Sequence, residues 1–269
     1  MRILKYLSFL FPKTIANKAL KLFLTPEKID RPESELPWYN SSKKSMVAGK
    51  YAAYEWGDSK EPIVLLIHGW AGRGTQLYSF IDPLILAHYR VVALDGPAHG
   101  DSLGTQTNAV QFSLFLKEAQ ENLGKVHAII AHSFGAGSSV LATANGMQVA
   151  KLVLIAGPSD YSKIVNDFLK IVQLGKRSQK YFIEILSQIA KREISELRIS
   201  KIGSKLATPT LVVHDKGDKE VSFQHALDIK TEWPNSELLA TEGLGHRRIL
   251  RDPETIKKVI GFIQSSSHA

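Results

Sequence analysis

The stretch Val126-His127-Ala128-Ile129-Ile130-Ala131-His132-Ser133-Phe134-Gly135-Ala136-Gly137 decides how the rest of the chain is interpreted. Residues 126–131 form a short apolar run, which is typical of a strand buried on both faces of a parallel sheet. Small residues then surround Ser133, and a helix-length segment continues to a stop at Gly146. A serine on so sharp a strand-to-helix turn has a strained backbone and projects its Oγ above the sheet. The stretch therefore predicts a nucleophile elbow.

The elbow pattern G-x-S-x-G reads here Ala131-His132-Ser133-Phe134-Gly135, with alanine in place of the first glycine. A five-residue match is weak evidence alone, because a serine followed two residues later by glycine also marks ordinary loops and helix starts. The rest of the chain has to decide between these interpretations.

Composition indicates an ordinary globular protein. With 269 residues, of which 44% are hydrophobic, the chain can bury a substantial core, and one α/β domain with an insertion suits this length. There is no cysteine, which excludes disulfides and thiolate metal or redox sites and makes a cytoplasmic location the expectation. Lys5 and Pro12 interrupt the first apolar run, so it is too short to span a bilayer, and no cleavage site for secretion is evident.

The formal net charge is +8, and the excess is concentrated in two segments. Residues 1–50 and residues 161–205 each carry ten Lys or Arg against four Asp or Glu. Such a balance raises nucleic acid, an anionic membrane or an acidic substrate as partners. Neither segment contains an aromatic-interleaved basic motif or a helix-turn-helix pattern, so we expect no nucleic-acid binding.

Residues 1–44 are predicted to be an N-terminal amphipathic helix followed by a connector. Between Pro12 and Pro26 the apolar residues recur at helical spacing, with lysines largely off that face. One interpretation is a peripheral membrane contact or a flap over an active site. The other is a helix packed on the domain, and the short length of the helix favours this one. Residues 26–44, rich in Pro and Ser, are interpreted as the connector.

Alternation over residues 45–56 predicts a hairpin or a pair of strands, and short apolar runs separated by helix-length segments then recur along the chain. This pattern predicts an α/β fold with a mostly parallel central sheet and helices on both faces, formed by residues 45–158 and 206–269. About fifty residues separate the last two apolar runs, far more than one crossover requires, so residues 159–205 are interpreted as an inserted helical cap. The runs are at 63–67, 90–94, 126–131, 151–155 and 210–214, and the predicted helices include residues 75–87.

The loop after the strand at 63–67 reads His68-Gly69-Trp70-Ala71-Gly72-Arg73-Gly74. Its glycines imply backbone exposed to a ligand. In acyl transfer the tetrahedral oxyanion needs two N–H donors, which this loop and the residue after the nucleophile can supply. We therefore nominate the N–H groups of Trp70 and Phe134 as an oxyanion hole. The phosphate-loop and dinucleotide-binding patterns are both absent from this loop.

The strand at 90–94 is followed by a turn that contains Asp95, His99 and Asp101. These side chains could be metal ligands, but no second ligand cluster is apparent. The favoured interpretation is a rigid turn whose carboxylates accept hydrogen bonds from backbone N–H groups, and we expect no metal site.

Two later turns carry a carboxylate and a histidine. Asp215 and Asp218 follow the strand at 210–214, at the carboxyl edge of the sheet where α/β sites form. His246 lies on a glycine-flanked loop after the predicted strand 237–241. The chain order Ser, Asp, His is the order expected for a hydrolase with a nucleophile elbow.

With these motifs in order, residues 45–269 resemble the α/β-hydrolase superfamily, and the loops at 68–74 and 244–253 are similar to a bacterial group described only as α/β hydrolases of unassigned substrate. The resemblance implies that Ser133 is the nucleophile, that His246 is the base and then the acid, and that Asp218 orients His246. Serine at the elbow argues against the dehalogenase and epoxide-hydrolase branches, which place aspartate there.

The resemblance implies a serine hydrolase, and we expect a carboxylesterase that cleaves small or medium acyl esters through an acyl-enzyme and needs no cofactor. A thioesterase, a lipase-like enzyme or a C–C bond hydrolase would use the same three residues. A non-catalytic binding protein of the same fold is the alternative from another class, because a fold does not determine function.

Overall fold

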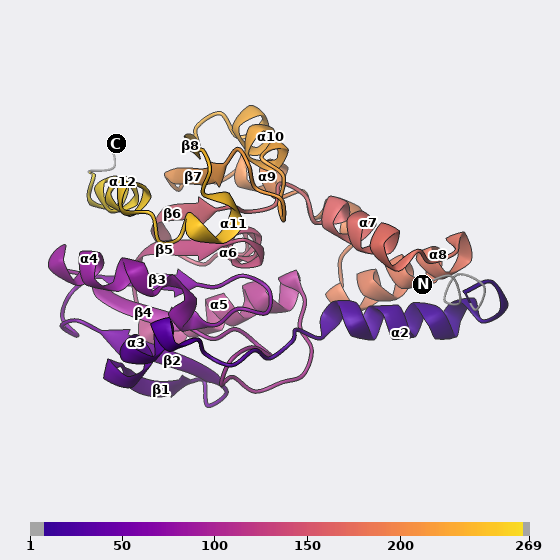
Figure 1. The fold of residues 1–269 in the computed structure, drawn as a ribbon, viewed down its shortest axis with the longest axis horizontal. Coiled ribbons are helices and arrows are strands. Elements are labelled where there is room, and N and C mark those ends of the chain that lie inside the picture. Colours follow the sequence, from indigo (N-terminus) through magenta and orange to yellow (C-terminus); the bar gives the residue numbers. More distant parts are fainter. Residues whose placement is uncertain (1–7, 266–269) are drawn as a thin grey trace.

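The computed structural model describes residues 8–265, so the first seven residues of the predicted N-terminal segment and the last four of the chain lie outside it. Within the described part, the centre is an eight-stranded sheet with the order β1-β2-β4-β3-β5-β6-β7-β8 (Figure 1). The strands are β1 Lys43–Val47, β2 Tyr51–Trp56, β3 Ile63–Ile67, β4 Arg90–Leu94, β5 Val126–His132, β6 Val149–Ile155, β7 Thr210–Asp215 and β8 Glu237–Thr241.

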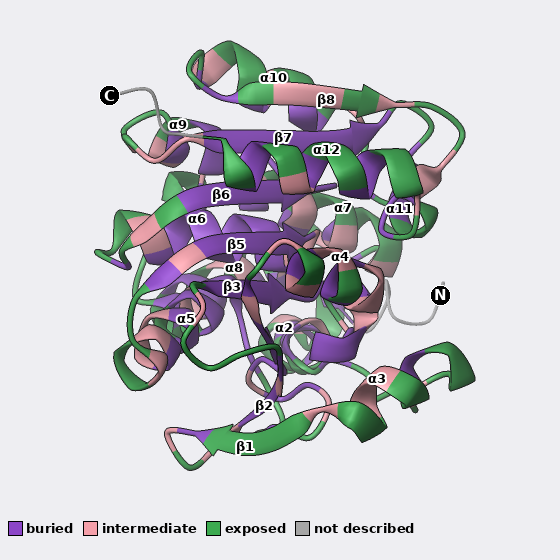
Figure 2. Cartoon of the chain, turned by 90° about the vertical axis from the view of Figure 1, so that its left-hand side faces the viewer, coloured by how far each residue is buried: buried purple, intermediate pink, exposed green. Residues whose placement is uncertain are grey.

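The sheet is parallel from β4 to β8, and β2 is antiparallel to both of its neighbours, β1 and β4. Its central strands are apolar along their whole length because both faces are covered. In β3, for example, Ile63, Leu65 and Ile67 enter one hydrophobic core while Val64 and Leu66 enter the other. Figure 2 shows the central strands buried and the outward faces of the surrounding helices exposed.

Helices cover both faces of the sheet. One core contains side chains of α5 (Ala109–Leu123), α6 (Phe134–Ala144), α9 (Ile199–Gly203) and α10 (Gln224–Glu232). The other contains side chains of η2 (Gly74–Phe80), α4 (Ile81–Leu86) and α12 (Pro253–Gln264). The short elements η1 (Glu33–Glu35), α3 (Leu36–Ser41) and α11 (Gly245–Arg248) complete the core of the fold. This is the α/β-hydrolase fold that the sequence predicted.

Three helices, α2 (Pro12–Leu24), α7 (Tyr161–Val172) and α8 (Lys176–Ala190), together form a projection that we call the arm, which extends beyond the sheet (Figure 1). With η3 (Ile194–Glu196), α7 and α8 lie between β6 and β7 in the chain. The apolar face of α2 packs on α8, and the Phe23 ring lies 4.9 Å from the Phe168 ring and 5.5 Å from the Phe182 ring, between centroids. The division of the chain into a core and a cap at residue 159 stays a prediction.

Two segments differ from the sequence-based expectation. Residues 75–87 form a 3₁₀ turn followed by the short helix α4, with a kink at Leu77, rather than one helix. Pro83 is the reason, because its ring would clash with the carbonyl four residues earlier, so an α-helix can begin only about one turn before it. The connector is also partly structured, since it contains η1 and α3 and since β1 begins at Lys43. None of the described helices is long and apolar enough to cross a membrane, and the cytoplasmic location stays a prediction.

The close contact of α6 with β3 gives a stability test. A Cβ added at Gly135 would lie 2.3 Å from the carbonyl oxygen of His68 and 2.9 Å from Cγ2 of Ile67. Gly135→Ala should therefore lower the free energy of unfolding by about 1–3 kcal/mol, measured by urea denaturation. The matched control is Gly261→Ala in α12, where a Cβ would meet open space, and it should raise the free energy of unfolding by about 0.5–1 kcal/mol. Equal stability of the two variants would contradict the packing argument.

Candidate active site

Ser133 occupies a strained turn between β5 and α6. Its φ of 51° and ψ of −118° lie in a region that residues other than glycine rarely adopt. The backbone N–H of Ser133 donates to the carbonyl of Ile155 at 2.8 Å, which ties the turn to β6. Ala131, where the elbow pattern has its first glycine, is fully buried in the core, so the extra methyl is accommodated.

The structure brings Ser133, His246 and Asp218 together in one hydrogen-bonded series. Nδ1 of His246 lies 2.7 Å from Oδ2 of Asp218, and its Nε2 lies 3.0 Å from Oγ of Ser133. An ionised carboxylate only accepts hydrogen bonds, so Nδ1 carries the proton and Nε2 is left to accept the serine hydroxyl proton. The arrangement is therefore suited to general-base activation of Ser133.

Hydrogen bonds keep the Asp218 carboxyl ionised. Its Oδ1 accepts the backbone N–H groups of Glu220 at 2.8 Å and Val221 at 2.9 Å. Burial opposes ionisation, but the hydrogen bonds of Asp218 to His214, His246 and Val221 outweigh it and hold the pKa of the carboxyl below its usual value.

Asp215, the other candidate acid, has a different set of partners. Its carboxylate accepts from the N–H of Gly217 at 2.9 Å, the hydroxyl of Thr241 at 2.8 Å and the N–H of Leu244 at 2.9 Å. These contacts join the loops after β7 and β8. Asp215 therefore supports the loops that carry Asp218 and His246.

Two further histidines contact this series, and no motif in the sequence indicated a role for either. His214 is fully buried, and its Nε2 donates to the carbonyl of Val221 at 2.8 Å and lies 3.4 Å from Oδ2 of Asp218. His132 donates from Nε2 to the backbone carbonyl of His246 at 2.9 Å. The sequence offered one indication of these roles, which is position: His132 directly precedes the elbow serine, and His214 lies at the end of β7.

The loop after β3 lies directly against Ser133. A Cβ at Gly69 would lie 3.0 Å from Cβ of Ser133, so this backbone approaches the serine as closely as a glycine allows. The N–H of Gly72 donates to the carbonyl of Gly69 at 3.0 Å, which closes a turn that leaves the intervening Trp70 N–H without a partner inside the turn. Phe134 is the first residue of α6, where a helix leaves its N–H groups unpaired.

His68 and Asp95 hold this loop to its neighbours. Nε2 of His68 accepts the N–H of Gly96 at 2.9 Å, and its Nδ1 donates to the carbonyl of Gly69 at 2.7 Å. The Asp95 carboxylate accepts the N–H of Gly74 at 2.6 Å and the N–H of Asp101 at 2.7 Å. The loop after β4 is thus the rigid turn that the sequence favoured, with a carboxylate bound to backbone N–H groups.

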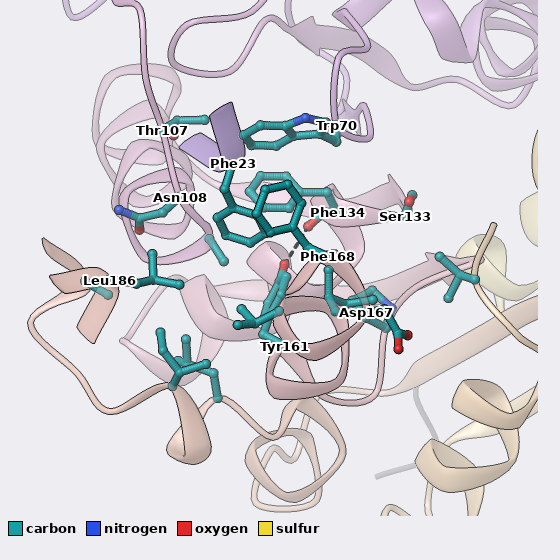
Figure 3. A pocket seen from close by; sticks show the side chains of 18 of the residues that line it. Phe23, Trp70, Thr107, Asn108, Ser133, Phe134, Tyr161, Asp167, Phe168 and Leu186 are labelled. Carbon is teal, nitrogen blue, oxygen red and sulfur yellow. Dashed lines mark hydrogen bonds between the residues drawn. The ribbon is translucent and has the colours of Figure 1, made fainter. Parts of the chain in front are cut away.

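An apolar cavity of about 410 Å³ opens above Ser133 and His246. Figure 3 shows the rings of Phe23, Trp70, Phe134 and Phe168 gathered around it. Aliphatic side chains of α7, α8 and the η3 region form part of the remaining wall, and residues 107–110 at the start of α5 form another part. The charged residues lining it, among those that the structure describes, are Asp167 and Glu220 beside the ionisable His246.

Tyr161 joins the arm to the elbow. Its buried hydroxyl donates to the carbonyl of Phe134 at 2.9 Å and lies 3.2 Å from Oγ of Ser138, as the dashed line in Figure 3 marks for the first contact. A Cβ at Gly137 would lie 2.7 Å from this hydroxyl, which explains the small residue there. Burial raises the pKa of Tyr161, so it stays a neutral donor.

This fold and this site define a class of protein. A model of the alpha/beta hydrolase family matches residues 64–258, and the chain belongs to that family. Among curated proteins, it is 26% identical over 261 residues to 2-hydroxy-6-oxononadienedioate/2-hydroxy-6-oxononatrienedioate hydrolase 2 of Pseudomonas putida, a match that covers 77% of this chain and 89% of that protein.

Solved structures show the same fold at low sequence identity. An alpha/beta hydrolase from the metagenome of sediments of the Mar Chica lagoon in Morocco is 24% identical, with a TM-score of 0.61 over 81% of this chain and 96% of that one. A membrane phospholipase A is 20% identical, with a TM-score of 0.66 over 97% of this chain and 94% of that one.

The buried histidines around the site predict sensitivity to acid. Burial lowers the pKa of His68 to about 4 and the pKa values of His99 and His132 to about 3. In the unfolded chain these groups bind protons below about pH 6.5, so the unfolded state gains protons that the folded state does not. The free energy of unfolding should therefore fall as the pH is lowered from about 6.5 to 4, by up to about 1.4 kcal/mol per pH unit for each histidine.

Urea denaturation at a series of pH values measures this slope. The Asp95 carboxyl acts in the opposite direction, because burial raises its pKa, but it is one group against three. A free energy of unfolding that stays level or increases on acidification would contradict the assignment of these histidines as neutral in the folded protein.

Proposed function

We propose that this protein is a serine hydrolase, specifically a carboxylesterase that cleaves small or medium apolar acyl esters. The observation that carries the proposal is the series Ser133–His246–Asp218 opening into an apolar cavity. Ser133 would attack the ester carbonyl while Nε2 of His246 takes its proton. His246 would then return the proton to the leaving alkoxide, and the acyl group would remain on Oγ until water attacks it by the same route.

Asp218 would keep Nδ1 of His246 protonated and stabilise the imidazolium that forms in the transition state. The oxyanion of the tetrahedral intermediate would accept hydrogen bonds from the N–H groups of Trp70 and Phe134, which we propose as the oxyanion hole. The close approach of the Gly69 backbone to Ser133 supports this role for the loop.

The lining of the cavity favours an apolar acyl group over a dicarboxylate. The Pseudomonas putida relative has a name that denotes a dioate substrate, which carries two carboxylates. A site for carboxylates would be expected to place Arg or Lys side chains against them. Among the described residues that line this cavity there is no Arg or Lys, and Asp167 and Glu220 would repel a carboxylate.

Hydrolysis of a C–C bond is the second candidate function. The name of the Pseudomonas putida relative supports it, because the dioate that this name denotes contains no ester bond, so a hydrolase acting on it would break a C–C bond. Ser133, His246 and Asp218 would serve both reactions, so only the substrate that the protein prefers distinguishes ester hydrolysis from C–C bond hydrolysis. A neutral ester and a dioate that carries the C–C bond to be cleaved are therefore the two substrates to compare.

The first functional prediction is a covalent acyl-enzyme on Ser133. A fluorophosphonate or an activated acyl ester should add its mass to the wild-type protein, as measured by intact-protein mass spectrometry. Ser133→Ala should give no adduct and should lower kcat for acyl esters by several orders of magnitude, about 10⁶-fold by analogy with a comparable triad. An adduct that persists in Ser133→Ala would contradict the role of Ser133, and a wild type that forms none would favour the non-catalytic alternative.

A substrate panel then tests the kind of bond. For wild-type protein, kcat/KM should be higher for uncharged acyl esters than for esters that carry a carboxylate, because the described residues that line the cavity include no Arg or Lys. Faster cleavage of the dioate than of every ester would favour the C–C bond hydrolase.

The second functional prediction separates the two carboxylates after β7. Asp218→Asn should lower kcat by about 10⁴-fold with the fold retained, because the amide no longer holds His246 in the useful tautomer. Asp215→Asn is the matched control, since it removes a carboxylate three residues away that does not contact His246. Asp215→Asn should lower the melting temperature, because Asp215 joins the loops after β7 and β8. It should lower kcat much less than Asp218→Asn does. The reverse result would make Asp215 the catalytic acid.

A further inference from the structure

The mouth of the cavity is rimmed by apolar side chains that are open to solvent. Leu22 on α2, Ile171 on α7 and Trp70 after β3 all line the cavity, yet they are 63%, 69% and 37% exposed. A side chain that both lines a cavity and contacts solvent lies at its opening. Large apolar side chains gathered at one exposed place mark a surface that contacts a partner or a membrane.

A second exposed apolar group lies on the same arm. Phe9, Leu10 and Phe11, directly before α2, are 74%, 65% and 58% exposed. The N–H of Gly175 donates to Oγ of Ser8 at 3.0 Å, and this contact fixes residues 8–11 beside the turn between α7 and α8. Of the first apolar group, Ile171 lies in the last turn of α7, beside that turn, while Leu22 lies in the last turn of α2, at the other end of that helix from residues 9–11.

The three helices of the arm have a net positive charge, because they carry eight Lys or Arg residues against the two acidic residues Asp167 and Glu184. Residues 8–26 contain Lys13, Lys18 and Lys21 and no acidic residue, and all three lysines are exposed. Lys18 precedes Leu22 by four residues, so the two side chains share one face of α2. On α8, Lys176, Arg177 and Lys180 are also exposed.

We propose that the arm docks on the surface of an anionic phospholipid bilayer, with the mouth of the cavity facing the lipid. Exposed aromatic and aliphatic side chains would enter the boundary between headgroups and acyl chains, while the lysines would lie near the phosphates. The apolar face of α2 packs on α8, as the sequence favoured, so the contact uses side chains outside that face. Docking is independent of catalysis, whereas delivery of a lipid acyl chain to Ser133 rests on the proposed function.

Co-sedimentation with vesicles tests the docking. Wild-type protein and Ser133→Ala should both bind vesicles of phosphatidylcholine mixed with phosphatidylglycerol, and should bind pure phosphatidylcholine vesicles much more weakly. Binding should weaken as salt is added, because exposed charges are screened. Use of Ser133→Ala keeps the lipid intact, so docking is measured whether or not the hydrolase proposal holds.

Variants locate the surface. Replacing Lys13, Lys18 and Lys21 by Gln should lower the partition coefficient about fivefold per lysine, or about 100-fold together. The double variant Phe9→Ser, Phe11→Ser should lower it at least about tenfold. Neither variant changes a residue that lines the cavity, so turnover of a soluble ester and the melting temperature should stay at wild-type values.

Matched controls come from the opposite end of the molecule, where α4 and α12 lie (Figure 1). Leu86→Ser removes an apolar side chain that is 81% exposed, and Lys257→Gln with Lys258→Gln removes two exposed lysines. These variants should bind the mixed vesicles as wild type does.

Three results would overturn the proposal. The first is no binding of wild-type protein to the phosphatidylglycerol vesicles even at low salt. The second is binding that the control variants reduce as much as the arm variants do. The third is a wild-type dimer in sedimentation velocity that becomes monomeric in the Phe9→Ser, Phe11→Ser variant, because the surface would then be an interface between two copies of this chain.

Discussion

The position of Ser133 depends on a backbone turn that is held by two contacts. Its φ of 51° is unfavourable for serine, and the turn persists because its N–H is bound to the carbonyl of Ile155 and because α6 packs so closely on β3 that only glycine fits at position 135. The strand β5, which leads into the turn, is buried on both faces apart from the half-buried His127, so the two cores fix the position at which the strand ends. The stability of the central sheet is thus what maintains a strained residue at its edge.

The electrostatics of the site follow from the same burial. Histidines beside the turn are held neutral by desolvation, so they act as hydrogen-bond partners of fixed tautomer and add no charge near the cavity. The Asp218 carboxylate, by contrast, is kept ionised by backbone and imidazole donors. The cavity wall is mostly apolar, and its charged residues among those that the structure describes are Asp167 and Glu220, beside the ionisable His246. The groups that transfer protons, Ser133 and His246, therefore lie at one edge of the cavity, and the rest of its volume would hold the acyl chain.

The sequence predicted the parts of the molecule that depend on local pattern. The apolar runs identified the central strands, and the order Ser133, Asp218, His246 placed three side chains at one sheet edge, because parallel strands end there together. The sequence could not show that His214 would contact Asp218, since that contact depends on how the loop after β7 folds back. Nor could it show that Phe23 would line the cavity, because the helix that carries it was interpreted only as packed on the domain, as a flap or as a membrane contact. The contacts that were missed depend on how a loop or a helix folds back on the rest of the chain, and local sequence pattern does not show this.

The arrangement of α2 has a consequence for the order in which the chain can fold. The hydroxyl of Ser178 donates to the carbonyl of Ser8 across 170 residues of sequence, and the partner helix of α2 is α8. A helix of 13 residues is marginally stable alone, so α2 gains its stability only after α8 has been synthesised. The wall that Phe23 contributes therefore forms only after α8 has been synthesised. A contact between segments so far apart in the chain slows folding. Until α8 is available, the apolar face of α2 is exposed and can bind chaperones during translation.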